Sequence, residues 1–218
     1  MLNLTVQNKP PATGGLVLHG ATRYDWLLWL VTLGRETALR EQILELAALE
    51  PGQSILDVGC GTGTLALAAK RRVGASGRVY GIDASPEMLS RAYQKAAKAR
   101  SDVTFLKAFA QELPFADGQF NTVLTTIMLH HLPRSSRRQC AREIARVLKP
   151  GGRVLAVDFG ASGSKHPTLL EHFRRPRHGS VKLSDLIALF SEEGLHCTQS
   201  GPVGISSLQF VVAQLANN

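Results

Sequence analysis

The sequence predicts an α/β fold built around a largely parallel sheet. Short apolar segments alternate with amphipathic segments along most of the chain, and such alternation gives parallel strands joined by right-handed crossovers. A glycine-rich turn follows the first of the apolar segments, at the kind of place where these sheets bind ligands. The last two apolar segments have no helix between them, so we expect them to form an antiparallel hairpin at one edge.

Two helices are expected before the sheet, at about residues 22–33 and 35–49. Gly34 ends the first, and the Pro51-Gly52 turn follows the second. This arrangement predicts a helical segment that precedes the sheet.

The first of these helices is apolar on all sides. Trp26 and Trp29 lie on one face, and the opposite face is apolar too, which is typical of a lid packed over a cleft. Tryptophan also favours membrane interfaces, so a lid that contacts lipid is the alternative. We therefore divide the chain into an N-terminal tail (1–20), a helical lid (21–50) and a main domain (51–218).

The main domain is expected to alternate strands and helices. Its strands are predicted at residues 55–58, 78–82, 103–107, within 119–129, at 153–159, and near 195–200 and 206–214. Its helices are predicted at residues 64–72, 86–100, 136–149 and 182–194.

Composition excludes several classes of protein. The chain of 218 residues is 44% hydrophobic, enough for one substantial core, and no apolar run approaches the length of a membrane-spanning helix. The N-terminus lacks the pattern of a signal peptide, and the three cysteines are scattered. We therefore expect a cytoplasmic protein with no metal site.

The net charge of +8 is concentrated in one region. Lys and Arg outnumber acids strongly between Arg134 and Lys182, and a basic linker is expected at 160–179. Such a patch suits a nucleic acid, an anionic membrane surface or a phosphorylated substrate, but a solvated helix face has the same composition. Peripheral contact with the inner membrane surface therefore stays open.

The glycine-rich turn predicts a nucleoside site. Gly59, Gly61 and Gly63 alternate directly after the first strand, and a helix follows. Glycine allows close backbone approach, and the helix start offers free N–H groups. Asp83 ends the second strand, where a carboxylate can accept hydrogen bonds from both hydroxyls of a ribose.

The spacing of the turn favours one nucleoside over another. Dinucleotide sites use G-x-G-x-x-G/A, but here Gly63 comes one position early. Asp57 precedes the turn, and it is a poor neighbour for a pyrophosphate and a good acceptor for an ammonium group. A ribose with an amino acid at its far end, as in S-adenosylmethionine (SAM), therefore fits better, and a dehydrogenase is disfavoured.

Five ordered segments, "LDVGCGTG", "GIDASPEML", "ELPFADGQFNTV", "LHHLP" and "ARVLKPGGRVLAVDF", resemble the class I SAM-dependent methyltransferases. They are most similar to the ubiquinone/menaquinone C-methyltransferase group, from about residue 24 to the C-terminus. The resemblance implies a Rossmann-like seven-stranded mixed sheet of order 3-2-1-4-5-7-6, with the last strand antiparallel and helices on both faces. It also implies SAM as the methyl donor and S-adenosylhomocysteine (SAH) as the product.

The resemblance assigns the donor site residue by residue. Asp83 would hold the ribose, and Thr126 would meet the amino-acid portion of the donor. The methionine end would be surrounded by Asp57, Gly59, Gly61, Thr62 and Gly63.

The adenine end departs from the family pattern. Ala84 and Met88 would flank the adenine, but Phe109 stands where the family often has Asp or Asn. With Phe109, Ala110 and Gln111 in this segment, adenine would rely on the Ala110 amide and on apolar packing.

The methyl acceptor is harder to predict. The methyl group on the SAM sulfur is already activated, so the enzyme mainly has to align the two reactants and needs few catalytic residues. His131, and less readily His130, are candidate bases after strand four, although they could instead cap the turn or pack against the donor. Tyr24 could cover the methyl-binding pocket or anchor its helix. The quinone enzymes usually have Met-Asn where this chain has Leu27-Leu28, and Arg-Asn in place of the two histidines.

We therefore expect a methyltransferase acting on a small apolar or amphiphilic acceptor, either quinone-like or a phospholipid such as phosphatidylethanolamine. An RNA methyltransferase is the first alternative, but the Asn/Asp-Pro-Pro-aromatic motif of base-amine enzymes is missing after strand four, so a nucleic acid partner is not expected. A non-catalytic SAM-binding regulator is the second.

Overall fold

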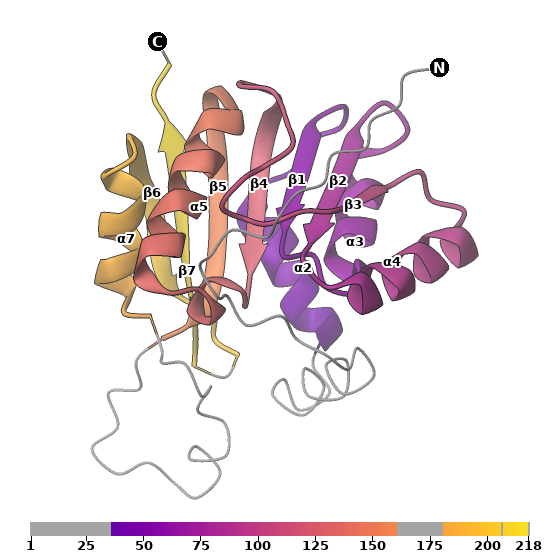
Figure 1. Cartoon of the computed structure of the whole chain (residues 1–218), viewed down its shortest axis with the longest axis horizontal. Helices are drawn as coiled ribbons and strands as arrows, with labels where there is room; N and C mark the ends of the chain where they lie inside the picture. The colour runs from indigo at the N-terminus through magenta and orange to yellow at the C-terminus, as the bar shows by residue number, and fades with distance from the viewer. Residues whose placement is uncertain (1–35, 161–180, 206, 218) are drawn as a thin grey trace, which may run out of the picture.

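The computed structural model describes residues 36–160, 181–205 and 207–217. They form one seven-stranded sheet in the order β3-β2-β1-β4-β5-β7-β6 (Figure 1). Only β7 runs against its neighbours β5 and β6, whereas the other pairs are parallel. This order and the antiparallel closing strand confirm the predicted fold.

The elements follow the predicted alternation. The strands are β1 (Ser54–Val58), β2 (Arg78–Asp83), β3 (Thr104–Lys107), β4 (Phe120–Thr126), β5 (Leu148–Phe159), β6 (Leu195–Pro202) and β7 (Leu208–Leu215). The helices are α2 (Glu36–Ala47), α3 (Thr64–Val73), α4 (Pro86–Ala99), the 3₁₀ turn η1 (Leu129–His131), α5 (Arg134–Val147) and α7 (Leu183–Ser191).

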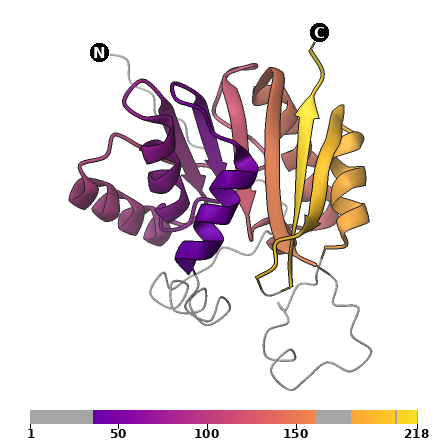
Figure 2. The same cartoon turned by 180° about the vertical axis from the view of Figure 1, so that it is seen from behind.

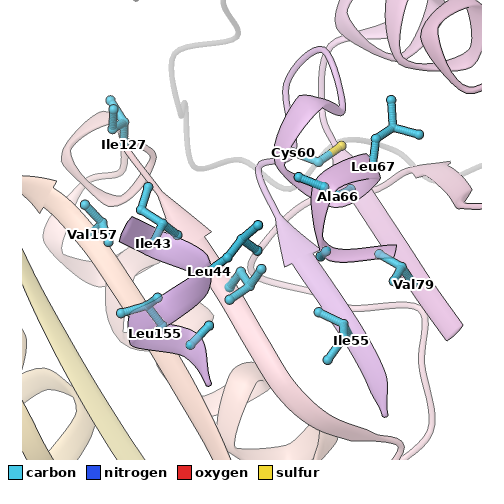
Figure 3. Packing of buried hydrophobic residues seen from close by; sticks show 14 of the residues in the cluster. Ile43, Leu44, Ile55, Cys60, Ala66, Leu67, Val79, Ile127, Leu155 and Val157 are labelled. Atoms are coloured by element: carbon cyan, nitrogen blue, oxygen red, sulfur yellow. The ribbon is translucent and has the colours of Figure 1, made fainter. Parts of the chain in front are cut away.

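Helices cover both faces of the sheet, because successive strand residues point to opposite sides. In β1, Ile55 packs with α2, α3 and α4, whereas Leu56 packs with α5 and α7. Figure 2 shows α2 in front of the central strands, and Figure 1 shows α5 and α7 on the other face. Figure 3 shows how α2 brings Ile43 and Leu44 against β5. The core is therefore split into two apolar layers by the sheet.

The register brings the carboxyl ends of the central strands to one edge. Val58 of β1 pairs with Ile82 of β2 on one side and with Thr125 of β4 on the other. Side chains at the ends of these strands and in the turns after them are therefore neighbours, which is where parallel sheets bind ligands.

The fifth strand begins earlier than the sequence predicted. We expected the Lys149–Gly152 segment to end a helix, but β5 already begins at Leu148. Leu148 pairs with Phe120 across an irregularity in the ladder, and Gln214 of β7 donates to the Gly151 carbonyl at 2.9 Å. Pairing with both neighbours therefore extends the strand through Pro150, although the local sequence indicates a turn.

Part of the predicted chain lies outside the described residues. This applies to the tail, to the apolar helix at 22–33 and to the basic linker at 160–179 apart from Gly160. In the parts that the structure does describe, none of the helices is both long and apolar enough to cross a bilayer.

Some basic side chains in the described part of this region are paired with acids. Arg138 and Arg142 of α5 form ion pairs with Glu192 and Glu193 after α7, at 2.9 and 3.3 Å. Exposed pairs of this kind add little stability, but they cancel charge locally. These two arginines therefore contribute less positive potential than the sequence suggested.

Candidate active site

The turn after β1 requires glycine at each alternate position. Gly59, Gly61 and Gly63 have φ angles of 75°, 53° and 74°, in the left-handed region that side chains disfavour. A Cβ atom at Gly59 would overlap Met128, and one at Gly63 would lie 2.6 Å from the Phe105 ring. The chain therefore passes unusually close to its neighbours here, and Gly63 starts α3.

Asp83 fastens this turn to the end of β2. Its carboxylate accepts hydrogen bonds from the Gly61 and Ser85 amides, both at 2.8 Å. Burial raises the pKa of Asp83, and the hydrogen bonds from the Ser85 and Gly61 amides oppose that rise. Each carboxylate oxygen can accept more than one hydrogen bond, so the side chain can still receive two neighbouring hydroxyls. This is the geometry expected of a ribose acceptor.

A cavity of about 280 Å³ opens beside the turn, between β1, β4 and α2. Its lining includes Asp57 and Thr126, and a carboxylate oxygen of Asp57 and the hydroxyl of Thr126 are buried without a hydrogen-bond partner in the described chain. Buried polar atoms without partners are costly and rare. Two such acceptors facing one cavity are suited to bind a positively charged hydrogen-bond donor such as an ammonium group.

The environment of Asp57 is strongly perturbed. Burial raises its pKa to about 7, the charge of Asp83 adds to the rise, and a hydrogen bond from the Ala66 amide opposes it. Only 2% of the residue is exposed. A carboxylate held in this way gains most from a bound positive charge.

A cation that the sequence analysis missed lines the same cavity. Lys95 of α4 donates from Nζ to the hydroxyls of Thr62 and Thr64, at 2.6 and 2.8 Å. A cavity that offers Asp57 and Lys95 together matches a zwitterionic amino acid. The available signal was helical spacing, because Lys95 follows the predicted adenine neighbour Met88 by two turns of one helix.

The residues predicted to surround adenine lie at the same edge. Pairing of β3 with β2 brings the segment that begins at Ala108 beside Asp83, and the Ala108 amide donates to the Asp83 carbonyl at 3.2 Å. Met88 is buried, whereas Ala84 and the residues that follow Ala108, namely Phe109, Ala110 and Gln111, are half-buried. Their contact with adenine stays a prediction.

A second cavity, of about 480 Å³, lies between α5 and α7. His130 and His131 form part of its wall, at the turn η1 that follows β4. Thr126 and Ile127, which line the first cavity, come directly before this turn in the chain. Ile127 has a φ of 54°, which is strained for a branched residue, and its amide donates to the Val157 carbonyl at 2.7 Å.

The two histidines differ in their surroundings. His130 is 2% exposed, and its Nδ1 lies 2.6 Å from a carboxylate oxygen of Asp158, at the end of β5. His131 is half-buried, and its ring centroid lies 3.8 Å from that of His130. His131 is therefore the more accessible of the two candidate bases. Tyr24, the third predicted catalytic residue, lies outside the described residues.

Comparisons with known proteins agree with this geometry. Residues 55–152 match the family described as a methyltransferase domain. The chain is 39% identical over 137 residues to the demethylmenaquinone methyltransferase of Halalkalibacterium halodurans, covering 62% of this chain and 55% of that protein. It is 35% identical to the 2-phytyl-1,4-naphtoquinone methyltransferase of Trichormus variabilis, covering 62% and 59%. The chain thus spans less than two thirds of these relatives.

Solved structures extend the agreement in fold. A SAM-dependent methyltransferase from Aquifex aeolicus superimposes with a TM-score of 0.72 at 20% identity, covering 91% of this chain and all of that one. A phosphoethanolamine methyltransferase from Haemonchus contortus also gives 0.72 at 19% identity, covering 90% and 57%. Residues 55–152 therefore match a methyltransferase domain, and the chain has the fold of these SAM-dependent methyltransferases. Over part of its length it is similar in sequence to quinone methyltransferases.

Proposed function

We propose that the protein transfers a methyl group from SAM to a quinone-like acceptor. The observation that carries the donor half of this proposal is the pair of unsatisfied buried acceptors, Asp57 and Thr126, in the cavity beside the glycine turn. An ammonium group held there would satisfy both and would neutralise a buried carboxylate.

The residues at this edge offer partners for the ammonium, carboxylate and ribose groups of SAM. Asp57 and Thr126 would bind the ammonium group, Lys95 would attract the carboxylate, and Asp83 would accept the ribose hydroxyls. When bound, the donor supplies an activated methyl group on a positive sulfur, so the protein chiefly has to align the acceptor and exclude water.

The acceptor half is supported by the second cavity and by the relatives. The cavity of about 480 Å³ is lined by His130 and His131, which follow Thr126 of the first cavity closely in the chain. Two relatives are named for demethylmenaquinone and for a naphthoquinone, which favours a quinone-like ring as acceptor. We take its reduced, hydroxylated form as the acceptor, because the hydroxyl groups make a ring carbon nucleophilic. The ring carbon would form the new bond to the methyl group as the sulfur takes the electron pair of the broken bond.

His131 would take up the proton that the acceptor loses. A neutral imidazole at the cavity wall has the right proton affinity near pH 7, and it can pass the proton on to solvent. This step leaves the acceptor methylated, the donor as neutral SAH, and one proton released.

Calorimetry tests the donor half first. SAM and SAH are expected to bind to the wild type, and NAD is not. Turnover is then measured with methyl-labelled SAM and 1,4-naphthohydroquinone, with phosphatidylethanolamine vesicles in a parallel arm.

His131→Ala is expected to lower turnover of the hydroquinone about 100- to 10,000-fold while SAH affinity stays unchanged. The matched control is His196→Ala, on the exposed edge strand β6, which should keep full turnover. No binding of either SAM or SAH by the wild type would contradict the proposal.

A further inference from the structure

We propose that Asp158 and His130 form a positioning pair that holds His131 in place. The inference rests on the proposed methyl transfer and adds to it two buried residues that would act through His131. Neither residue was assigned this part by the sequence.

Asp158 accepts the hydrogen bonds that hold His130 of the turn η1 in place. It lies at the end of β5, only 1% exposed, and its two oxygens accept hydrogen bonds from Nδ1 of His130 at 2.6 Å, from the His130 amide at 2.9 Å and from the Phe159 amide at 2.7 Å. One carboxylate therefore fixes both the side chain and the backbone of His130.

This contact fixes the tautomer of His130. A carboxylate can only accept hydrogen bonds, so Nδ1 of His130 carries a hydrogen whether the ring is neutral or charged. Nε2 is then the only atom of this ring that can gain or lose a proton. The imidazole is thus presented in one defined form.

The fixed ring supports His131. The His130 ring lies against His131, with centroids 3.8 Å apart and planes tilted by 45°, and it meets the Phe159 ring edge-on at 5.2 Å. Rotation of His130 would break both ring contacts and the bond to Asp158. His131 therefore rests on a surface that cannot turn freely.

Further charged groups frame the same turn. Arg137 of α5 donates from Nε to the carbonyls of Leu129 and Leu132, at 2.8 and 2.9 Å, and it is electrostatically coupled to Asp158 and to Asp185 of α7. Arg134, Arg138 and Glu192 complete the charged part of the cavity lining.

A gain in folding stability does not by itself explain why the Asp158–His130 pair is buried. Burying two ionisable groups costs free energy that their attraction repays only in good geometry, and apolar residues of similar size often stabilise a fold as well or better. Here the pair lies beneath a candidate base, on the wall of a cavity, where fixed orientation and a nearby negative charge have a use.

Nitrogen NMR of the histidine rings tests the inference without any acceptor. In the wild type saturated with SAH, His130 is expected to show the Nδ1–H tautomer. In Asp158→Leu, which offers no acceptor to Nδ1, this tautomer should no longer be held. A His130 ring that keeps the Nδ1–H tautomer in this variant would overturn the inference.

A second variant guards against misfolding of the first. His130→Asn keeps an amide N–H that can donate to Asp158 but removes the ring beneath His131. Turnover of 1,4-naphthohydroquinone is expected to fall about tenfold to a hundredfold, comparable to losing supporting partners at metal sites. KM for the hydroquinone and SAH affinity should stay at their wild-type values.

The two proposals fail in different ways. Unchanged kcat in His130→Asn, with SAH bound normally, would overturn the positioning pair and leave the proposed function intact. Failure of the wild type to bind SAH or SAM would instead contradict the proposed function, while the tautomer of His130 would still be measurable.

Discussion

Replacing Asp57 with asparagine is expected to stabilise the protein without ligand at pH 8 while weakening its binding of SAM. The side chain lies at the end of β1, and burial raises its pKa from the ordinary value of 3.8 to about 7. Its charged form is therefore disfavoured by the fold, and the bound ammonium group of SAM is what would compensate it.

The size of the effect follows from the shift. The folded state binds the Asp57 proton more tightly than the unfolded state, so stability is lost as pH rises from about 4 to about 7. A shift of about three units corresponds to roughly 4 kcal/mol above that window. Asparagine removes the charge but leaves a buried N–H without a partner, at a cost of about 1–3 kcal/mol. The net gain at pH 8 is therefore about 1–3 kcal/mol.

Urea unfolding without ligand measures this directly. The free energy of unfolding of the wild type should fall between pH 5 and pH 8, and that of Asp57→Asn should fall much less. Asp102→Asn is the control, because this exposed carboxyl, paired with Lys70 at 3.0 Å, has a lowered pKa and titrates below the window. A wild type whose stability is flat from pH 5 to 8, with a variant less stable at pH 8, would refute the reasoning.

Calorimetry completes this test on the binding side. Loss of one hydrogen bond between charged groups, worth about 1.5–3 kcal/mol, should weaken SAM binding by Asp57→Asn about 10- to 150-fold. The wild type should release a proton on binding SAM near pH 6.5, since Asp57 is largely protonated without ligand and ionised beside the ammonium. Heats measured in buffers of different ionisation enthalpy report that proton.

Three further predictions concern the turn, the ribose site and the loop before β4. Gly63→Ala should lower the free energy of unfolding by about 2–4 kcal/mol, from the positive φ and the overlap with the Phe105 ring, and an unchanged thermal midpoint would contradict this. Asp83→Asn should raise the Kd for SAM about 10- to 100-fold by calorimetry, whereas wild-type affinity would remove its role at the ribose. In Glu143→Gln, loss of the Arg146 pair should cost about 1 kcal/mol at pH 7 in urea unfolding. Because the pair lowers the pKa of Glu143, the cost should shrink as pH falls below the ordinary carboxyl range, and a cost that does not shrink would argue against the pair.

The fold could be predicted because local patterns and topology agree. Apolar strand segments, helix starts such as Ser85-Pro86, and the missing helix before β7 together fix the alternation and the closing hairpin. The start of β5 could not be predicted, since Pro150 and its neighbouring glycines indicate a turn locally. Pairing with Phe120 and with β7 decides the outcome there.

The candidate site could likewise be predicted only where a local sequence motif marks the residue. Asp57 and Asp83 could be predicted, because each stands at the end of a strand in a recognisable motif. For Lys95, helical spacing from Met88 indicates the face of α4, but only the structure shows that this face meets Thr62 and Thr64. Asp158 is 28 residues from His130, and only the neighbouring positions of β4 and β5 in the sheet bring the two together.

The double use of Asp83 limits how the nucleotide preference of this protein can be redesigned. The carboxylate that would hold the sugar also anchors the Gly61 amide, so an exchange made to admit a modified sugar would loosen the loop that shapes the rest of the pocket. Analogues altered at the base, which is predicted to lie near Phe109, leave that anchor untouched. Engineering for synthetic methyl donors should therefore begin at the purine end.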